Sequence, residues 1–365
     1  MILIFAAGAA VLLLLWNLYY EKSWQKGLGV QLSFQRDYAY AGEETALLLA
    51  IENRKRLPIP LLEAAFHVRR ELSFLDVVNT KTSDYTYKRD IFSMLGHQRI
   101  TRTLRLLCTR RGFYEIHDVD FTTYSLFHRK SYLASREART EFYVYAKRVD
   151  VSDLVIQCEK LSGASQCARR LYEDPFAFRG IREYTIQDPM KNINWKATAK
   201  TGRMMVNTYD STQMERVMLY LDAEDPGILK QEKLLEECIS VAATLAQRLM
   251  GKGMEVGLAV NCRDEKGEHL CLMPENGRTQ RSRIEQLLAS LTGREEFIPF
   301  GAILSQRPGE AMAVYISKNY RTAPEELWSS SGLWVLPMAA NDAKAAAVSS
   351  GSRELAIVKR KVEGA

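Results

Sequence analysis

Residues 180–209 bring together side chains that could bind a charged partner or ligand. The stretch contains the acids Glu183 and Asp188 and the aromatic side chains Tyr184 and Trp195. Its cations are Arg182, Lys191, Lys196, Lys200 and Arg203. Cations of this kind make charge-assisted hydrogen bonds, and Trp and Arg are enriched among the residues that dominate binding at protein interfaces. The stretch is too polar for an ordinary core, so it predicts either a docked structural element or a binding site.

Local sequence rules predict a helix in the second half of this stretch. The Asp188 side chain can accept hydrogen bonds from free helical N–H groups, and Pro189 suits the first helical position because it has no N–H. Gly202 stands where a left-handed residue would end the helix. We therefore expect Asp188 to be a structural cap.

Two interpretations of the neighbouring side chains stay open. In the first, the helix is docked between domains, with Trp195 packed in a core and Arg182 in a buried ion pair. In the second, Arg182, Tyr184, Lys191, Trp195 and Lys196 form an exposed surface that binds a partner. Cations beside a helix N-terminus gain nothing from the helix dipole, which favours the second interpretation for Arg182 and Lys191.

Nucleic-acid binding is a further possibility for the same residues, with Trp195 as a stacking platform. However, cations at the end of a helix are explained more simply by its exposed carbonyl groups. The net charge of +6 is also mild for a chain of 365 residues. We therefore expect no nucleic-acid partner.

The spacing of these residues resembles the signature of a bacterial family, the domain-of-unknown-function family fifty-eight. That signature runs roughly Gly-x-Arg-x-Tyr-x-x-Gly-Asp-x-x-Arg-x-Ile-x-Trp-x-x-x-Ala-Arg. The matching residues are Arg182, Tyr184, Asp188, Ile193, Trp195 and Ala199. Lys191 and Lys200 replace two arginines, and Gln187 replaces a glycine.

The resemblance implies a role in protein assembly rather than a known reaction. Members are commonly encoded beside AAA-type ATPases of the MoxR group and beside membrane transglutaminase-like proteins. It therefore implies an adaptor that presents a surface to a MoxR-type ATPase, and possibly to a transglutaminase-like membrane protein, during maturation of envelope proteins. The alternative is a ligand- or metal-dependent enzyme or binder that uses the signature residues or the acids near Asp222.

The chain opens with an uncharged apolar stretch at residues 2–20. Its length suits a helix across the hydrocarbon layer of about 30 Å, and Trp16, Tyr19 and Tyr20 resemble interfacial anchors. A secretory signal peptide is the competing interpretation, but it requires a basic leading region and small residues at a cleavage site. Lys22 and Lys26 follow the stretch, so the positive-inside rule predicts a single-pass protein of the bacterial inner membrane with cytoplasmic domains.

Residues 213–338 alternate between strand-like and helix-like patterns, which predicts an α/β domain with a mainly parallel sheet. This part resembles a von Willebrand factor type A-like domain, and the metal-binding form of that domain holds magnesium through Asp-x-Ser-x-Ser. Asp222 occupies the aspartate position, but both serines are missing. Lys318 stands where a later aspartate is expected. We therefore expect no magnesium and no other cofactor, with Asp222, Glu224 and Asp225 as weak metal candidates.

The earlier part of the chain reads as strands separated by glycines and prolines, which predicts an immunoglobulin-like β-sandwich. The fold class expected for the chain is therefore α+β and multidomain. The predicted parts are a transmembrane anchor at 1–21, the sandwich at 28–148, the signature segment at 165–212, the α/β domain at 213–338 and a flexible tail at 339–365. Within that tail, residues 353–362 suggest a short basic helix.

No catalytic motif stands out in the sequence. There is no phosphate-binding loop, no His-Glu-x-x-His pair and no Gly-x-Ser-x-Gly elbow. The six cysteines are scattered through apolar runs without a Cys-x-x-Cys pair, which indicates reduced thiols in a core. We therefore expect a binding protein rather than an enzyme.

Overall fold

The computed structural model describes residues 2–76, 80–125, 130–169, 178–186, 188–209, 215–227, 230–263, 267–293, 295–304, 311–328, 330–349 and 355–363. The chain divides into two compact units. Unit 1 comprises residues 1–148 and 285–292, and unit 2 comprises residues 149–284 and 293–365.

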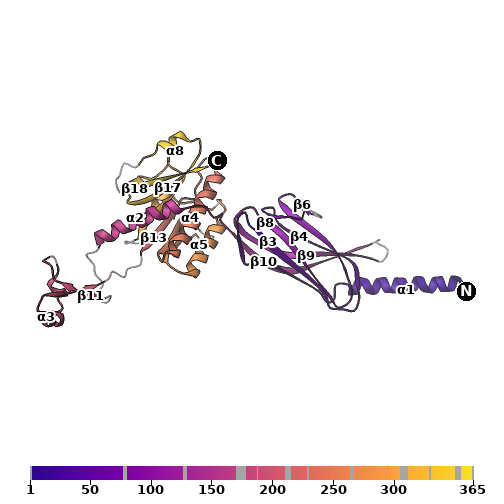
Figure 1. Ribbon diagram of the computed structural model, residues 1–365. Helices are drawn as coiled ribbons and strands as arrows, with labels where there is room; N and C mark the ends of the chain where they lie inside the picture. The colour runs from indigo at the N-terminus through magenta and orange to yellow at the C-terminus, as the bar shows by residue number, and fades with distance from the viewer. Residues whose placement is uncertain are drawn as a thin grey trace. The chain divides into compact units, whose positions relative to one another are not determined.

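Unit 1 is built on two β-sheets. The first sheet is antiparallel and has the order β1 (Leu28–Phe34), β3 (Glu44–Asn53), β8 (Gln98–Cys108) and β5 (Leu72–Phe74). The second has the order β2 (Tyr38–Tyr40), β10 (Ser131–Tyr145), β9 (Gly112–Tyr124), β4 (Ile59–Arg69), β7 (Tyr85–Met94) and β6 (Thr80–Thr82). Its pairs are antiparallel except for β2 with β10. Figure 1 shows the two layers.

One apolar core joins the two sheets into a β-sandwich. Leu47 and Leu49 of β3 and Phe121 and Phe142 of the other sheet are all fully buried in this core. The ring of Phe142 stacks on the ring of Phe34 from β1, with 4.2 Å between centroids. Removal of this apolar surface from water is the main force that holds the sheets together.

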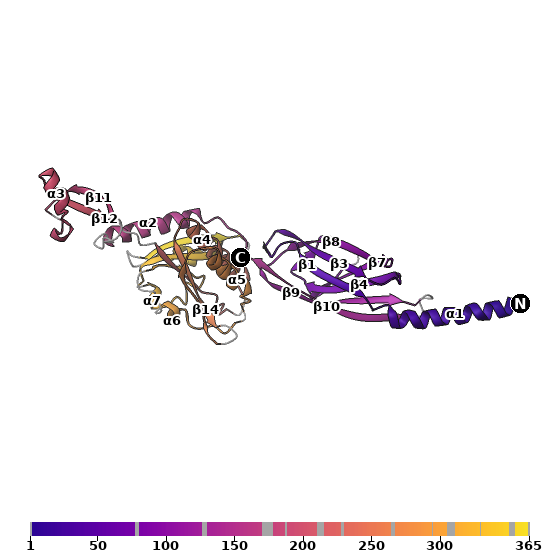
Figure 2. The same cartoon turned by 90° about the horizontal axis from the view of Figure 1, so that it is seen from below.

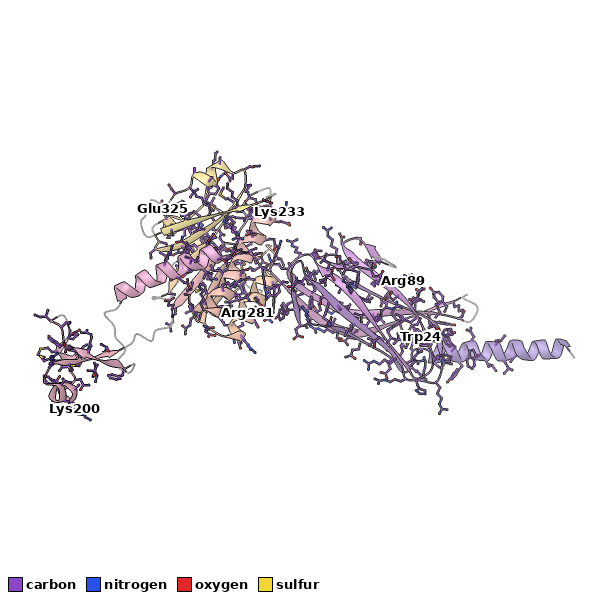
Figure 3. The ribbon with its side chains drawn as sticks, in the orientation of Figure 1. Trp24, Arg89, Lys200, Lys233, Arg281 and Glu325 are labelled. Carbon is purple, nitrogen blue, oxygen red and sulfur yellow. The ribbon has the colours of Figure 1, made fainter. Side chains whose placement is uncertain are left out.

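The first helix, α1 (Ile2–Ser23), does not support the predicted transmembrane anchor. No helix in the described part of the chain is both long and apolar enough to span a membrane. The end of α1 is instead built into the sandwich: Tyr20 is 5% exposed, and its hydroxyl lies 3.0 Å from the hydroxyl of Thr123. Trp24, labelled in Figure 3, is also buried in the sandwich core. Tyr20 is therefore a core residue and not an interfacial anchor.

Unit 2 contains a six-stranded sheet with the order β15 (His269–Glu275), β14 (Glu255–Arg263), β13 (Arg216–Leu221), β16 (Met312–Ile316), β17 (Gly332–Ala339) and β18 (Leu355–Val362). Its described pairs are parallel except for β14 with β15. Across the whole described chain, however, most of the sheets are antiparallel because of the sandwich. The predicted fold class was therefore wrong in its transmembrane helix, and a parallel sheet describes unit 2 alone.

Helices cover both faces of this sheet. They are α2 (Ser152–Arg169), α4 (Glu232–Gly251), α5 (Arg278–Ser290), α6 (Phe300–Leu304), α7 (Glu325–Trp328) and α8 (Ala343–Ala347). Phe300 of α6 and Leu327 of α7 share a core with Tyr220 of β13 and Trp334 of β17. Helix α4 contacts β13, β14 and β17 but has no residue in that core, so it lies on the opposite face (Figure 2).

Within the predicted flexible tail, the described residues 339–349 and 355–363 are part of the folded unit. Residues 343–347 form α8, and Leu355–Val362 forms β18 rather than a basic helix. β18 runs parallel to β17 from the pair Gly332 and Leu355 to the pair Ala339 and Val362. The sequence suggested a basic helix because Lys359, Arg360 and Lys361 stand near the end of β18. Leu355 at the start of the strand is buried.

The cysteine thiols lead to a testable prediction. Burial raises the pKa of Cys108, Cys158, Cys238 and Cys262 to about 12. Cys271 is exposed on β15. Since the thiolate is the reactive form, iodoacetamide at pH 8 should alkylate Cys271 well before these four residues, as measured by peptide mass spectrometry. Alkylation of Cys238 in the folded protein as fast as Cys271 would contradict the buried core, and denatured protein should lose the difference.

Candidate functional site

The predicted binding residues lie in a small module that we call the signature module, residues 178–209 without 187. It contains β11 (Phe178–Glu183), the short 3-10 helix η1 (Met190–Asn192), α3 (Trp195–Thr201) and β12 (Met205–Tyr209). β11 and β12 form an antiparallel hairpin in which Arg182 pairs with Val206. The buried side chains of Ile193 and Val206 lie at a bridge between η1 and β12. This bridge, with both side chains buried, ties the helical part to the hairpin.

Asp188 does not cap a helix as predicted. The turn after it is capped at Pro189, and no side chain makes a cap hydrogen bond there. The Asp188 carboxylate instead accepts two hydrogen bonds from the Arg182 guanidinium, at 2.7 and 2.5 Å. It also accepts the backbone N–H and the hydroxyl of Thr185, both at 2.8 Å. The Asp188 carboxylate therefore accepts four hydrogen bonds from Arg182 and Thr185 instead of binding free N–H groups at a helix start.

The true helix start lies six residues later, at Asn194. Its side-chain oxygen accepts the N–H of Ala197 at 2.9 Å, and its amide donates to Asn207 of β12 at 2.7 Å. The Thr198 hydroxyl accepts the N–H of Met205 at 3.0 Å. As predicted, Gly202 ends the helix in the left-handed conformation, with φ 70°. The single helix expected here is thus two short helices, broken at Ile193.

Both acids of the signature module are paired within it. Asp188 pairs with Arg182, and Glu183 pairs with Arg203 at 2.8 Å. Arg182 is half-exposed, so the ion pair is not the buried one that a purely structural interpretation requires. Hydrogen bonds from the Arg182 guanidinium, and then those from Thr185, hold the pKa of the Asp188 carboxyl well below its usual range.

The other predicted binding residues remain exposed. The Trp195 side chain is 67% exposed, so it is not the predicted packing anchor. Lys191, Lys196 and Lys200 are exposed and have no carboxylate partner among the residues that the structure describes. Figure 3 shows Lys200 projecting from α3. Tyr184 is half-buried and uses its N–H to bond the Met204 carbonyl.

Apolar side chains add to this exposed surface. Met190 of η1 is 70% exposed, and Ile186 in the preceding turn is 95% exposed. Large exposed apolar groups gathered in one small module are typical of an interaction site. Lys191, Trp195 and Lys196 are thus all exposed side chains of the signature module, whereas Arg182 is in its ion pair with Asp188.

The acids near Asp222 are not brought together as a metal site. Asp222 is buried at the carboxyl end of β13, and Asp225 turns its carboxylate to the N–H of Gln231 at 2.5 Å. Within the described ranges, no group of three or more His, Cys, Asp and Glu side chains could hold a metal ion.

The sequence did not predict the residues that organise the signature module or those that surround Asp222. Asn194 caps α3, and asparagine is a favoured residue at this position. The Asp188-Pro189 pair is a stronger start signal, so the helix was predicted to begin there. Asn261 of β14 and Asn319, which follows β16, donate to Asp222 at 2.8 and 2.9 Å. Such distant partners leave no local pattern in the sequence.

The Asp188 ion pair makes a prediction about pH. Because its pKa is depressed in the folded state, Asp188 stabilises the module above its usual pKa of 3.8, and this stabilisation is lost as the pH falls through the depressed value. A carbon NMR titration of the Asp188 carboxyl should therefore have a midpoint below 3.8 in the folded chain.

Two variants test whether Arg182 causes the lowered pKa of Asp188. Arg182→Ala should move that midpoint up toward the usual value, whereas the matched variant Arg203→Ala, which breaks the other ion pair, should leave it unchanged. An Asp188 midpoint that does not respond to Arg182→Ala would show that Thr185 alone sets the pKa.

Comparisons with known proteins agree with the sequence signature. The family described as "Protein of unknown function DUF58" matches residues 180–308. No curated protein matches the chain. Solved structures that resemble part of the chain include the CARDB domain of a Pyrococcus furiosus protein, with 11% identity, 33% of this chain and 90% of that chain covered and a TM-score of 0.22. A non-cellulosomal cohesin from Archaeoglobus fulgidus has 11% identity, coverages of 35% and 96% and a TM-score of 0.22.

A cohesin module from a Clostridium perfringens family 33 glycoside hydrolase has 12% identity, coverages of 32% and 96% and a TM-score of 0.22. Similarities at this level support no conclusion about the function of this chain. The family match carries more weight because it begins at Gly180 and includes the signature residues of the module as well as the first strands of the unit 2 sheet. Residues 180–308 are therefore similar to the DUF58 family of proteins of unknown function.

Proposed function

We propose that this protein is a non-catalytic adaptor whose signature module binds a partner protein. The observation that carries the proposal is the exposure of Trp195, at 67%, beside three lysines without a carboxylate partner in the described part of the chain. Exposed tryptophans of this kind are costly to leave in water and are frequent among the residues that dominate interface energies.

The charge balance of the module favours an acidic partner. Its acids Glu183 and Asp188 are already neutralised by Arg203 and Arg182. Lys191, Lys196 and Lys200 therefore leave a net positive surface around Trp195. Complementary charges across an interface speed association and select the partner, while the buried aromatic group supplies affinity.

The partner that we propose is a MoxR-type AAA ATPase. This choice rests on the resemblance to the family, whose members are commonly encoded beside such ATPases. A transglutaminase-like membrane protein is the second partner that the same resemblance implies. In this role the protein would present clients or partners to the ATPase during the maturation of envelope proteins.

Binding of a purified MoxR-type ATPase from the same genome tests the proposal. Trp195→Ala should weaken binding by at least about 30-fold, which corresponds to a loss of about 2 kcal/mol at a central interface residue. The melting temperature should change little, because the side chain is exposed. Isothermal titration and thermal melts of the same preparations measure both effects.

A matched variant controls for general effects of removing an exposed apolar group. Leu133 of β10 is 71% exposed, and Leu133→Ala should leave binding unchanged. Lys191→Glu combined with Lys196→Glu should reduce the association rate, and added salt should reduce the difference from the wild type. If Trp195→Ala binds the ATPase as tightly as the wild type does, the module is not the docking surface.

A further inference from the structure

The two edges of the unit 2 sheet differ in the charge that they carry. Its terminal strands are β15 and β18, and each pairs with one other strand among the described residues. Lys359 and Lys361 are exposed on β18, and lysines on an edge strand commonly protect it from pairing with another chain. β15 has no charged residue between His269 and Glu275. The β15 edge therefore lacks the protection that the β18 edge has.

Pro274 does not protect the β15 edge either. A proline protects an edge when its missing N–H would face the open side. The Pro274 nitrogen lies on the β14 side, because a Cβ added at Gly257 of β14 would come within 2.9 Å of it and within 2.7 Å of the Leu272 carbonyl oxygen. Successive residues of a strand direct their N–H and C=O groups to opposite edges. With Leu272 turned toward β14, Cys271 presents its N–H and C=O at the open edge.

The side chains around Cys271 are apolar and only partly covered. Exposed and half-buried side chains alternate along β15. Met273 is 60% exposed, Cys271 is also exposed, and Leu270 and Leu272 are half-buried. A further strand beside β15 would bond its open backbone groups and cover part of this apolar surface.

We propose that β15 pairs with β15 of a second copy of this chain, in an antiparallel register centred on Cys271. In this register, the two Cys271 residues exchange backbone hydrogen bonds across the two-fold axis. Leu270 faces Leu272 of the second copy, so two apolar pairs flank the axis. His269 faces Met273 of the second copy, and neither of these pairs brings like charges together.

The charges of β15 and its flanks favour a second copy as the occupant of this edge. In the register centred on Cys271, Glu275 faces Gly267 of the second copy, and Glu268 faces Pro274. No acid therefore lies opposite another acid, an arrangement that would destabilise the pair. Glu275 lies 3.8 Å from Arg283 of its own copy, which also reduces its charge at the edge.

Symmetry distinguishes this pairing from one that uses the other edge. If β15 paired with β18 of another copy, an open edge would remain at each end and the contact would generate a filament. Pairing of β15 with itself closes after two copies and leaves the lysine-bearing β18 at both outer edges. The six-stranded sheets of two copies thus join into one continuous sheet, whatever the signature module binds.

Sedimentation equilibrium of the full chain over a range of concentrations tests the proposal. The wild type should fit a monomer–dimer equilibrium. Cys271→Lys brings two ammonium groups together at the two-fold axis, so it should raise the dissociation constant by at least about tenfold. Met273→Lys adds a charge beside the axis and should also weaken the dimer.

Two matched variants separate the edge from general effects. Cys271→Ser keeps a small uncharged side chain on β15 and should dimerise as the wild type does. Met190→Lys adds the same charge at a methionine that is 70% exposed in the signature module, and it should leave the dimer unchanged. Thermal melts of all four variants check that each one folds.

Oxidation by diamide tests the register itself. Facing residues that exchange hydrogen bonds in an antiparallel pair have Cα atoms about 5.5 Å apart, and this distance lies within the range that a disulfide spans. Diamide should therefore link two copies through Cys271, as mapped by peptide mass spectrometry, and Met273→Lys should slow the reaction.

Three results would overturn the proposal. The first is a wild type that stays monomeric at every concentration. The second is self-association that neither Cys271→Lys nor Met273→Lys weakens, which would place the contact on another surface. The third is a dimer in which diamide forms no disulfide between the two Cys271 residues.

Discussion

Internal neutralisation of carboxylates is the constraint on which both candidate sites depend. In the signature module, Arg182 forms an ion pair with Asp188, and Arg203 forms one with Glu183. In unit 2, Lys318 lies against Asp225 and the loop that follows Asp222. Both acids of the signature module are paired within it, so the net charge of its surface is set by Lys191, Lys196 and Lys200. The sequence suggested that Asp188 caps a helix, whereas the folded chain uses this acid in an ion pair with Arg182.

The sequence predicted elements well where hydrophobicity alternates or repeats cleanly. The alternating residues 98–108 form β8, and the helical repeat of apolar residues in α4 ends at Gly251, where a helix stop is expected. β7 was missed because its buried positions include Thr86, Lys88 and Asp90, so that its period of two is hidden by polar residues. Lys88 and Asp90 lie within 4.0 Å of each other, a pairing that only the folded sheet reveals.

The same limit explains what could be predicted of the sites. The signature located the module and its exposed residues, since these are set by the order of residues along a short segment. The role of Asp188 was wrong because Arg182, six residues earlier, competes for the same carboxylate. Lys318 could be read as a residue that disfavours a metal ion, but its contact with the Glu224 carbonyl needs two distant loops to meet.

The position of β18 also affects the order in which unit 2 can form. β17 is an inner strand of the sheet only because β18 covers its far side along the full length from Gly332 to Ala339. During synthesis, β17 therefore leaves the ribosome with open hydrogen-bonding groups and apolar side chains, and chains at this stage are prone to pair with one another. The exposed residues Lys359 and Lys361 then place positive charge on the edge strand, which disfavours pairing with a second copy, whereas Arg360 is paired with Glu237.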